Sequence, residues 1–190
     1  MSDFLDRARA AAGDDGRLAL GGMPQWEVFP FEADLLRVRP LDEYADPEPD
    51  RRKDPADCKV CQALGRPELV LHEGDHLTVI RTGGTSLVFT ANVVSRAHAP
   101  LDDLADDGLA ELGLLVGRTY RALRALPEVG NVHVNKWENG AGHLAVVLLA
   151  RPRGVLQLQG SNLPIWADML PPVLEEEYAE RAGRVRRALA

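Results

Sequence analysis

The sequence is poor in cysteine, in long apolar runs and in basic residues. It has two cysteines in 190 residues, and they lie three positions apart. A pair this close, in a reducing compartment, argues against a structural disulfide. No apolar stretch approaches the roughly 20 residues that span a bilayer, so we expect no membrane-spanning helix.

Basic residues are outnumbered, 22 against 29 acidic residues, and the formal net charge is −7. The chain therefore lacks a broad cationic surface that would attract phosphate backbones, and we expect no nucleic-acid partner. Its start, Met1–Asp6, has no basic segment followed by an apolar run, which a secretion signal would require. We expect a cytoplasmic protein.

The length and the composition predict a single core with extensions rather than two domains. Residues 1–57 are predicted to be an N-terminal extension and linker, because glycines interrupt residues 13–22 and four prolines fall in residues 40–57. Residues 4–12 have helix-forming composition. The apolar residues of 25–39 suit one or two strands or an extended arm.

The middle of the chain changes from a strand pattern to a helix pattern and back. Apolar residues recur at helical spacing from Asp102 until Pro127, which predicts a long helix, and Pro171 opens a terminal helix. This order predicts an α+β fold with one long helix packed on an antiparallel sheet. The predicted strands are residues 69–71, 77–81, 86–94, 131–137, 143–150 and 155–158.

Cys58 and Cys61 are the local cluster whose residue types require a chemical explanation. Two thiols at this spacing form a redox pair, hold half of a tetrahedral metal site, or are simply reduced and buried. A thioredoxin-like motif follows a strand and opens a helix, whereas this pair follows a proline-rich connector. We therefore favour zinc, which needs two further ligands.

Two of the five histidines are placed to supply those ligands. His98 follows the third predicted strand, and His143 opens the last long one. If these strands are neighbours, both imidazoles can meet the cysteine loop at one sheet edge. Two thiolates and two imidazoles are a usual ligand set of structural zinc. His72 and His76 flank a turn and are the alternative ligands.

These features resemble the histidine triad (HIT) superfamily, which includes nucleotide hydrolases and galactose-1-phosphate uridylyltransferases. The resemblance covers about residues 58–153 and implies a HIT-like antiparallel sheet with one long packed helix, followed by a C-terminal extension over residues 154–190. Some members carry zinc, and the positions of their metal ligands correspond to Cys58, Cys61, His98 and His143 in this chain. The matching segments are residues 58–61, 73–77, 87–104, 135–140 and 143–153.

The chain departs from the family at its catalytic signature. Counted from His143, the HxHxH motif has Ala145 at its second position and Val147 at its third. In the family, the middle histidine attacks the α-phosphorus and carries the nucleotidyl group covalently, which requires an imidazole lone pair. Side chains alternate along a strand, so the face that bears this chemistry is here small and apolar. The Gly-Gln-Ser segment that contacts phosphate in the hydrolases is also missing.

The resemblance implies a homodimer and a nucleotide or sugar-phosphate ligand. Asn135, Lys136, Asn139 and Arg151 fall where relatives contact ribose and phosphate, or nearby. The alternative is turn chemistry and solvated strand ends. We favour a non-catalytic zinc-binding module that holds such a ligand or serves as a scaffold. The other hypothesis is a divergent nucleotidyltransferase or hydrolase with a non-standard catalytic residue, for which His133 is a conceivable nucleophile.

Overall fold

The computed structural model describes residues 9–19, 21, 25, 29–31, 36, 47, 49–137 and 142–190. Residues 1–50 and 51–190 form two separate units. In the first unit, residues 9–10 are helical, and the rings of Phe29 and Phe31 meet edge to face at 5.9 Å. Most of the helix predicted over residues 4–12, and most of the arm predicted over 25–39, lie outside the described residues.

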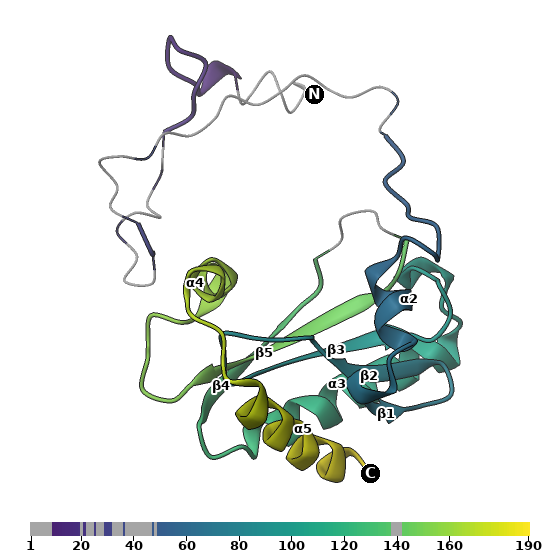
Figure 1. Ribbon diagram of the computed structural model, residues 1–190. Coiled ribbons are helices and arrows are strands. Elements are labelled where there is room, and N and C mark those ends of the chain that lie inside the picture. The colour runs from purple at the N-terminus through teal and green to yellow at the C-terminus, as the bar shows by residue number, and fades with distance from the viewer. Residues whose placement is uncertain are drawn as a thin grey trace. The chain divides into compact units, whose positions relative to one another are not determined.

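Residues 51–190 are built on a five-stranded antiparallel sheet with the order β1-β2-β3-β5-β4 (Figure 1). The first three strands form the predicted meander, and β5 lies between β3 and β4. The predicted α+β class and HIT-like layering are confirmed. The strands are β1 (Val70–Glu73), β2 (Leu77–Arg81), β3 (Phe89–Ser95), β4 (Val129–Asn135) and β5 (Ala145–Pro152).

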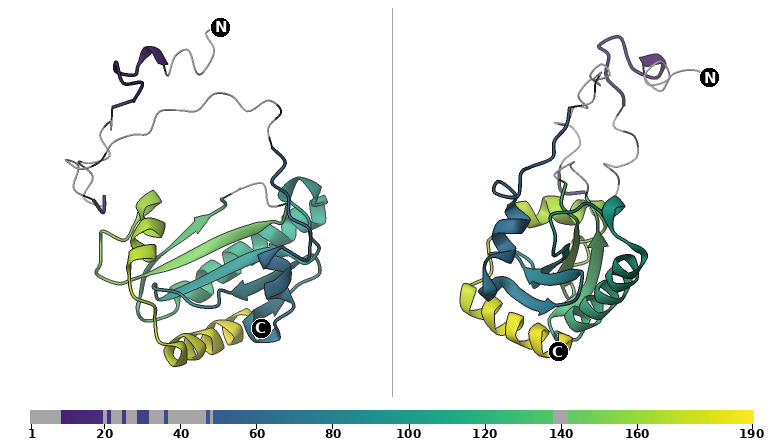
Figure 2. Two further views of the ribbon diagram at one scale, coloured as in Figure 1. Left: turned by 45° about the horizontal axis from the view of Figure 1, so that its top comes forward. Right: turned by 90° about the vertical axis from the view of Figure 1, so that its right-hand side faces the viewer.

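Two helices, α3 (Asp106–Arg124) and α5 (Glu175–Leu189), lie side by side over one face of the sheet (Figure 2). The apolar spacing of α3 buries Leu115 and Leu123 against this face. Acidic residues in the first turn of α3 and arginines in its last turn complement the helix dipole. No described helix is long and apolar enough to cross a bilayer.

Tyr178 fixes α5 to the sheet. Its buried hydroxyl donates a 3.0 Å hydrogen bond to the carbonyl of Thr90 and lies 2.9 Å from the Thr82 hydroxyl. Arg81 stacks over its ring at 4.9 Å and forms a 2.9 Å ion pair with Glu175. The predicted boundaries at 57/58 and 153/154 stay predictions, but α5 contributes buried side chains to the same core as the strands.

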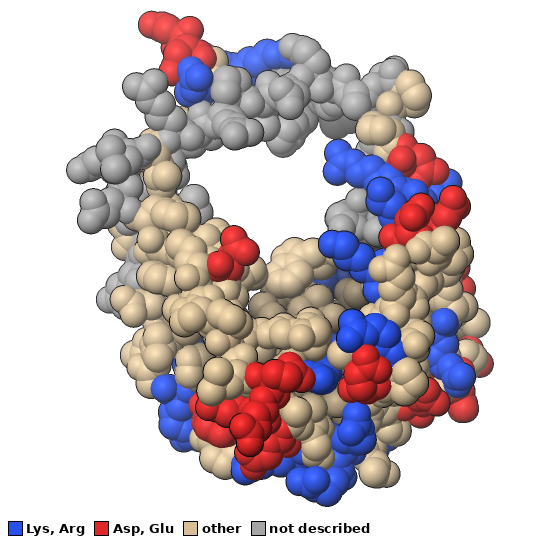
Figure 3. All heavy atoms as spheres, in the orientation of Figure 1, with Lys and Arg blue, Asp and Glu red and all other residues tan. Residues whose placement is uncertain are grey.

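A second, smaller cluster covers part of the opposite face of the sheet. It consists of Leu87, Leu149, Leu158 and Leu163, and it brings helix α4 (Leu163–Met169) onto β5. Figure 3 shows that the surface around α4 is mostly uncharged, whereas acidic and basic side chains alternate around α5. Helix α4 follows a short 3-10 helix over Gly160–Asn162. Sequence periodicity did not predict α4, because two helical turns are too short to show a repeat.

The strand predicted over residues 155–158 is wrong. These residues form turns, because Gly154 adopts a left-handed φ of +84° and directs the chain away from the sheet. Leu158 then packs in the second cluster instead of in a ladder.

Candidate metal centre

The two thiols are presented by the start of a short helix, α2 (Lys59–Leu64). A turn over residues 54–58 leads into it, and Cys58 is the residue that precedes its first turn. Cys61 lies in that first turn, so both sulfurs emerge on one side. Both cysteines are free, and Cys58 is only 3% exposed. Sequence analysis did not predict this helix, which has no buried residue and therefore no apolar stripe.

The two imidazoles come from neighbouring strands. Val94 on β3 pairs with Ala145 on β5, so the chain leaving β3 and the chain entering β5 meet at one end of the sheet. The loop that carries His98 is held there because Leu144 donates its N–H to the Ala99 carbonyl at 2.9 Å. Sequence analysis predicted that His98 and His143 would meet if the two strands were neighbours, and the pairing of β3 with β5 fulfils this condition.

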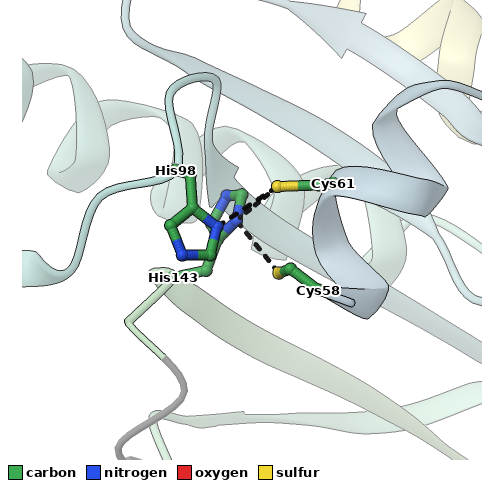
Figure 4. Close-up of side chains that lie close together, drawn as sticks. All are labelled: Cys58, Cys61, His98 and His143. Atoms are coloured by element: carbon green, nitrogen blue, oxygen red, sulfur yellow. Dashed lines mark hydrogen bonds between the residues drawn. The ribbon is translucent and has the colours of Figure 1, made fainter. Parts of the chain in front are cut away.

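Figure 4 shows the four side chains pointing toward one another. The Cys58 sulfur lies 3.4 Å from Nδ1 of His143, and the Cys61 sulfur lies 3.2 Å from Nδ1 of His98 and 3.4 Å from Nδ1 of His143. All four ligand atoms lie within 4.8 Å of one another. In a tetrahedral zinc site, Zn–S of about 2.3 Å and Zn–N of about 2.05 Å place sulfur and nitrogen about 3.6 Å apart. The arrangement therefore fits a small tetrahedral cation.

The outer nitrogen of His143 is also in the state that a metal ligand needs. Its Nε2 donates a 2.8 Å hydrogen bond to the Ser95 carbonyl, which leaves the Nδ1 lone pair directed at the sulfurs. Burial lowers the pKa of His143, and although the Ser95 bond opposes this effect, His98 adds to it. Burial and the neighbouring Cys58 raise the pKa of the Cys61 thiol. A bound cation would offset the cost of deprotonating two adjacent thiols.

The alternative histidine ligands lie outside this cluster. His76 Nε2 forms a 3.1 Å contact with the Asp107 carboxylate, and the backbone N–H of His76 donates to Glu111. His72 lies on edge strand β1, opposite Val79. Within the described part of the chain, Cys58, Cys61, His98 and His143 are the one group of three or more such side chains that could hold a metal ion.

The predicted ligand-contact residues are spread over β4 and β5. Asn135 ends β4 opposite Val147, and Lys136 follows it. Asn139 lies outside the described residues. Arg151 is six residues beyond Ala145, which places it about 20 Å from the metal end of the strand at the usual rise. Ligand contact by these residues stays a prediction.

A pocket of about 320 Å³ opens beside the cysteine cluster. Lys53, Lys59 and the half-exposed Trp137 border it. Sequence analysis did not select the two lysines as site residues. The position of Lys59 between the two cysteines is the sequence feature that could have indicated it. The remaining lining residues are Asp57, Cys58, Val60, His143 and Ala145.

Ala145 and Val147, at which the resemblance predicts histidines in catalytic relatives, differ in their surroundings. Ala145 lines the pocket, whereas Val147 packs against the cluster that holds α4 to the sheet, together with Trp166. The C-terminal segment thus covers this part of the face. Valine at position 147 is explained by that packing, because an imidazole there would bury polar atoms against leucines.

Neither a protein-family model nor a curated protein sequence matches the chain. Solved structures do match it. A Zn-bound histidine triad family protein from Mycobacterium smegmatis is 16% identical with a TM-score of 0.53, covering 72% of this chain and 95% of its own. A histidine triad protein from Bradyrhizobium japonicum is 19% identical, also at 0.53, with coverages of 65% and 92%.

A third structure is a hypothetical histidine triad nucleotide-binding protein from Sulfolobus tokodaii. It is 17% identical with a TM-score of 0.53, and the match covers 70% of this chain and 91% of that one. At these identities the similarity concerns the fold. The chain has the histidine triad fold, as the sequence resemblance predicted.

Proposed function

We propose that this histidine triad fold carries a zinc ion and binds a nucleotide or another phosphate-bearing ligand without transferring a nucleotidyl group. The observation that carries the proposal is the convergence of Cys58, Cys61, His98 and His143 directly beside a pocket in which Ala145 stands at the nucleophile position. The metal ligands are present in full, and the side chain that would attack phosphorus is absent.

Zinc is supported by the chemistry of the ligand set. Two thiolates and two imidazoles at tetrahedral spacing suit zinc, and four protein ligands leave no open position for a reacting water. The similar Mycobacterium smegmatis protein is a Zn-bound one. When bound, the ion would tie the segment before α2 to the ends of β3 and β5.

A phosphate-bearing ligand is supported by the two lysines and the tryptophan at the pocket. Ammonium groups bind phosphate as point charges, and an aromatic ring offers a stacking surface for a base. The pocket lies near the lower limit of small-molecule sites, about 300 Å³. The similar Sulfolobus tokodaii protein is described as nucleotide-binding. A cytoplasmic location remains part of the proposal, since two free thiols suit a reducing compartment.

A homodimer is also part of the proposal. Val134 on edge strand β4 faces the α3 side of the sheet yet is 44% exposed, and Leu109 on α3 is 42% exposed. Between Asp107 and Arg121, the exposed residues of α3 carry no charge; they are Leu109, Ala110, Gly113 and Leu114. Pairing α3 antiparallel with a second copy would place Asp106 of each chain near Arg121 of the other, so the surface is self-complementary.

We expect His98→Asn to lose its metal, because three remaining ligands cannot complete the site. Zinc measured by mass spectrometry on the untreated protein should fall from about one ion per chain toward zero, with a lower melting temperature. His72→Asn removes a histidine outside the cluster and should keep both values. Equal zinc in the two variants would contradict the assignment.

Adenosine monophosphate should bind in the pocket, and Lys59→Gln should weaken it by about tenfold, the size of one lost charge-assisted hydrogen bond. Calorimetric titration measures this change. Arg66→Gln, which removes an exposed charge just after α2, is the matched control and should bind like the wild type. Unchanged affinity in Lys59→Gln would place the ligand elsewhere.

Wild-type protein should not turn over adenosine 5'-phosphoramidate, dinucleoside polyphosphates or uridine diphosphate sugars, because Ala145 has no nucleophilic nitrogen. The double variant Ala145→His, Val147→His tests whether the pocket can regain turnover. Product formed by the wild type would instead support the divergent enzyme, and His133→Gln would then test the relocated nucleophile.

Leu109→Glu should raise the dissociation constant of the dimer by about tenfold or more, because the substitution buries a charge at the interface. Sedimentation velocity over a concentration series measures this shift. Leu156→Glu, at a 68% exposed position on a loop outside that surface, should leave the dimer unchanged. A wild type that is monomeric throughout the series would refute the homodimer.

A further inference from the structure

Three arginines gather where β4 begins and β5 ends, far from the cysteine cluster. Arg124 at the end of α3 donates to the carbonyl of Gly130, and Arg153 donates to the carbonyl of Val129 at 3.4 Å. Arg151 donates to the carbonyl of Pro152 at 3.0 Å. Because Val129 and Pro152 are cross-strand partners, the three arginines donate to backbone carbonyls at or next to a single step of the ladder.

Gly130 makes room for this cluster. The β4–β5 register shifts between Val129 and Asn131, so an extra residue is present in β4 at this step. A Cβ atom at position 130 would lie 2.8 Å from Nη1 of Arg151 and 2.9 Å from Cα of Arg153. Any side chain here would collide with the two arginines, and the bulge thereby provides the space for the Arg151 guanidinium.

The charge of the cluster is not compensated within the described residues. None of the three arginines forms an ion pair there, although Arg66, Arg81, Arg181 and Arg184 each do. The neighbouring acid, Glu128, lies 3.6 Å from Arg181 instead. This uncompensated positive charge stands in a protein whose formal net charge is −7.

Two buried nitrogens in the same place also lack a partner. Nε of Arg151 and Nε2 of His133 are buried, and neither has a hydrogen-bond partner among the described residues. His133 pairs with Leu149 across the ladder, so it shares the sheet face of Arg151. Burial and then the charge of Arg151 lower the pKa of His133. Buried polar atoms without a partner require explanation in a folded chain.

We propose that Arg151, Arg153 and His133 form a second binding site, which takes the phosphate group of a small molecule. A phosphate dianion has enough oxygens to accept from both guanidinium groups and the ring, and its charge offsets the uncompensated charge of the arginines. Arg124 holds the Gly130 carbonyl and adds to the positive potential. The site lies about 20 Å along β5 from the pocket beside the metal centre, so it is separate from the proposed nucleotide site.

The test is a titration of isotope-labelled full-length protein with inorganic phosphate, in a phosphate-free buffer at about 0.1 M salt to screen non-specific attraction. Arginine Nε–H and histidine ring signals are followed by nuclear magnetic resonance. We expect saturable shifts of Arg151 and His133. Arg151→Gln and the more exposed Arg153→Gln should each weaken binding by about tenfold. Phenyl phosphate, a small phosphomonoester, should bind at least as well, and acetate more weakly.

Arg187→Gln is the matched control, since it removes an exposed arginine from the last turn of α5. It should change the affinity less than about twofold. If it weakens binding as much as Arg151→Gln, the site holds an adventitious ion only and the proposal fails. Absence of saturation, or acetate binding as tightly as phosphate, would also overturn it. Zinc content and adenosine monophosphate binding, measured on Arg153→Gln, keep this outcome independent of the metal-side pocket.

Discussion

The structure around the site depends on one pairing, the antiparallel ladder between β3 and β5. Because Val94 lies opposite Ala145, the loop with His98 and the residue His143 are brought to the same end of the sheet, and the helix that carries the thiols closes over them. The hydrogen bond from His143 to the Ser95 carbonyl then orients the ring. A slip of one residue in this ladder would turn His143 to the other face and separate the ligands.

The two ends of β5 have acquired different chemistry on a shared sheet face. At the start, Ala145 lines a pocket bordered by two lysines. In the middle, Val147 and Leu149 pack against residues of the C-terminal segment, which covers this part of the sheet face. At the end, arginines surround a bulge. The same strand face thus lines a pocket at one end and forms a packing surface in the middle.

Much of the fold could be predicted from local pattern, and the rest required knowledge of tertiary contacts. The long helix was visible because its apolar spacing persists over five turns, and the first strands because glycine turns at residues 74 and 83–84 separate their apolar runs. Nothing local specified that β5 enters between β3 and β4. Helices α2 and α4 are too short to show a period, and Leu158 is apolar for a packing reason that a strand pattern imitates. Lys53 and Lys59 become site residues only once the pocket is formed.

The 85 positions that separate Cys58 from His143 affect the order in which the molecule assembles. Closing so long a segment costs chain entropy, and the cost grows only with the logarithm of its length, so most of it is met when β3 and β5 pair. Binding of the proposed ion would then have to bring in only the nearby helix that carries the thiols. If the site holds an ion as proposed, a newly made chain should fold its sheet first and bind the ion late, so that metal supply would affect the packing of this helix rather than the topology of the fold.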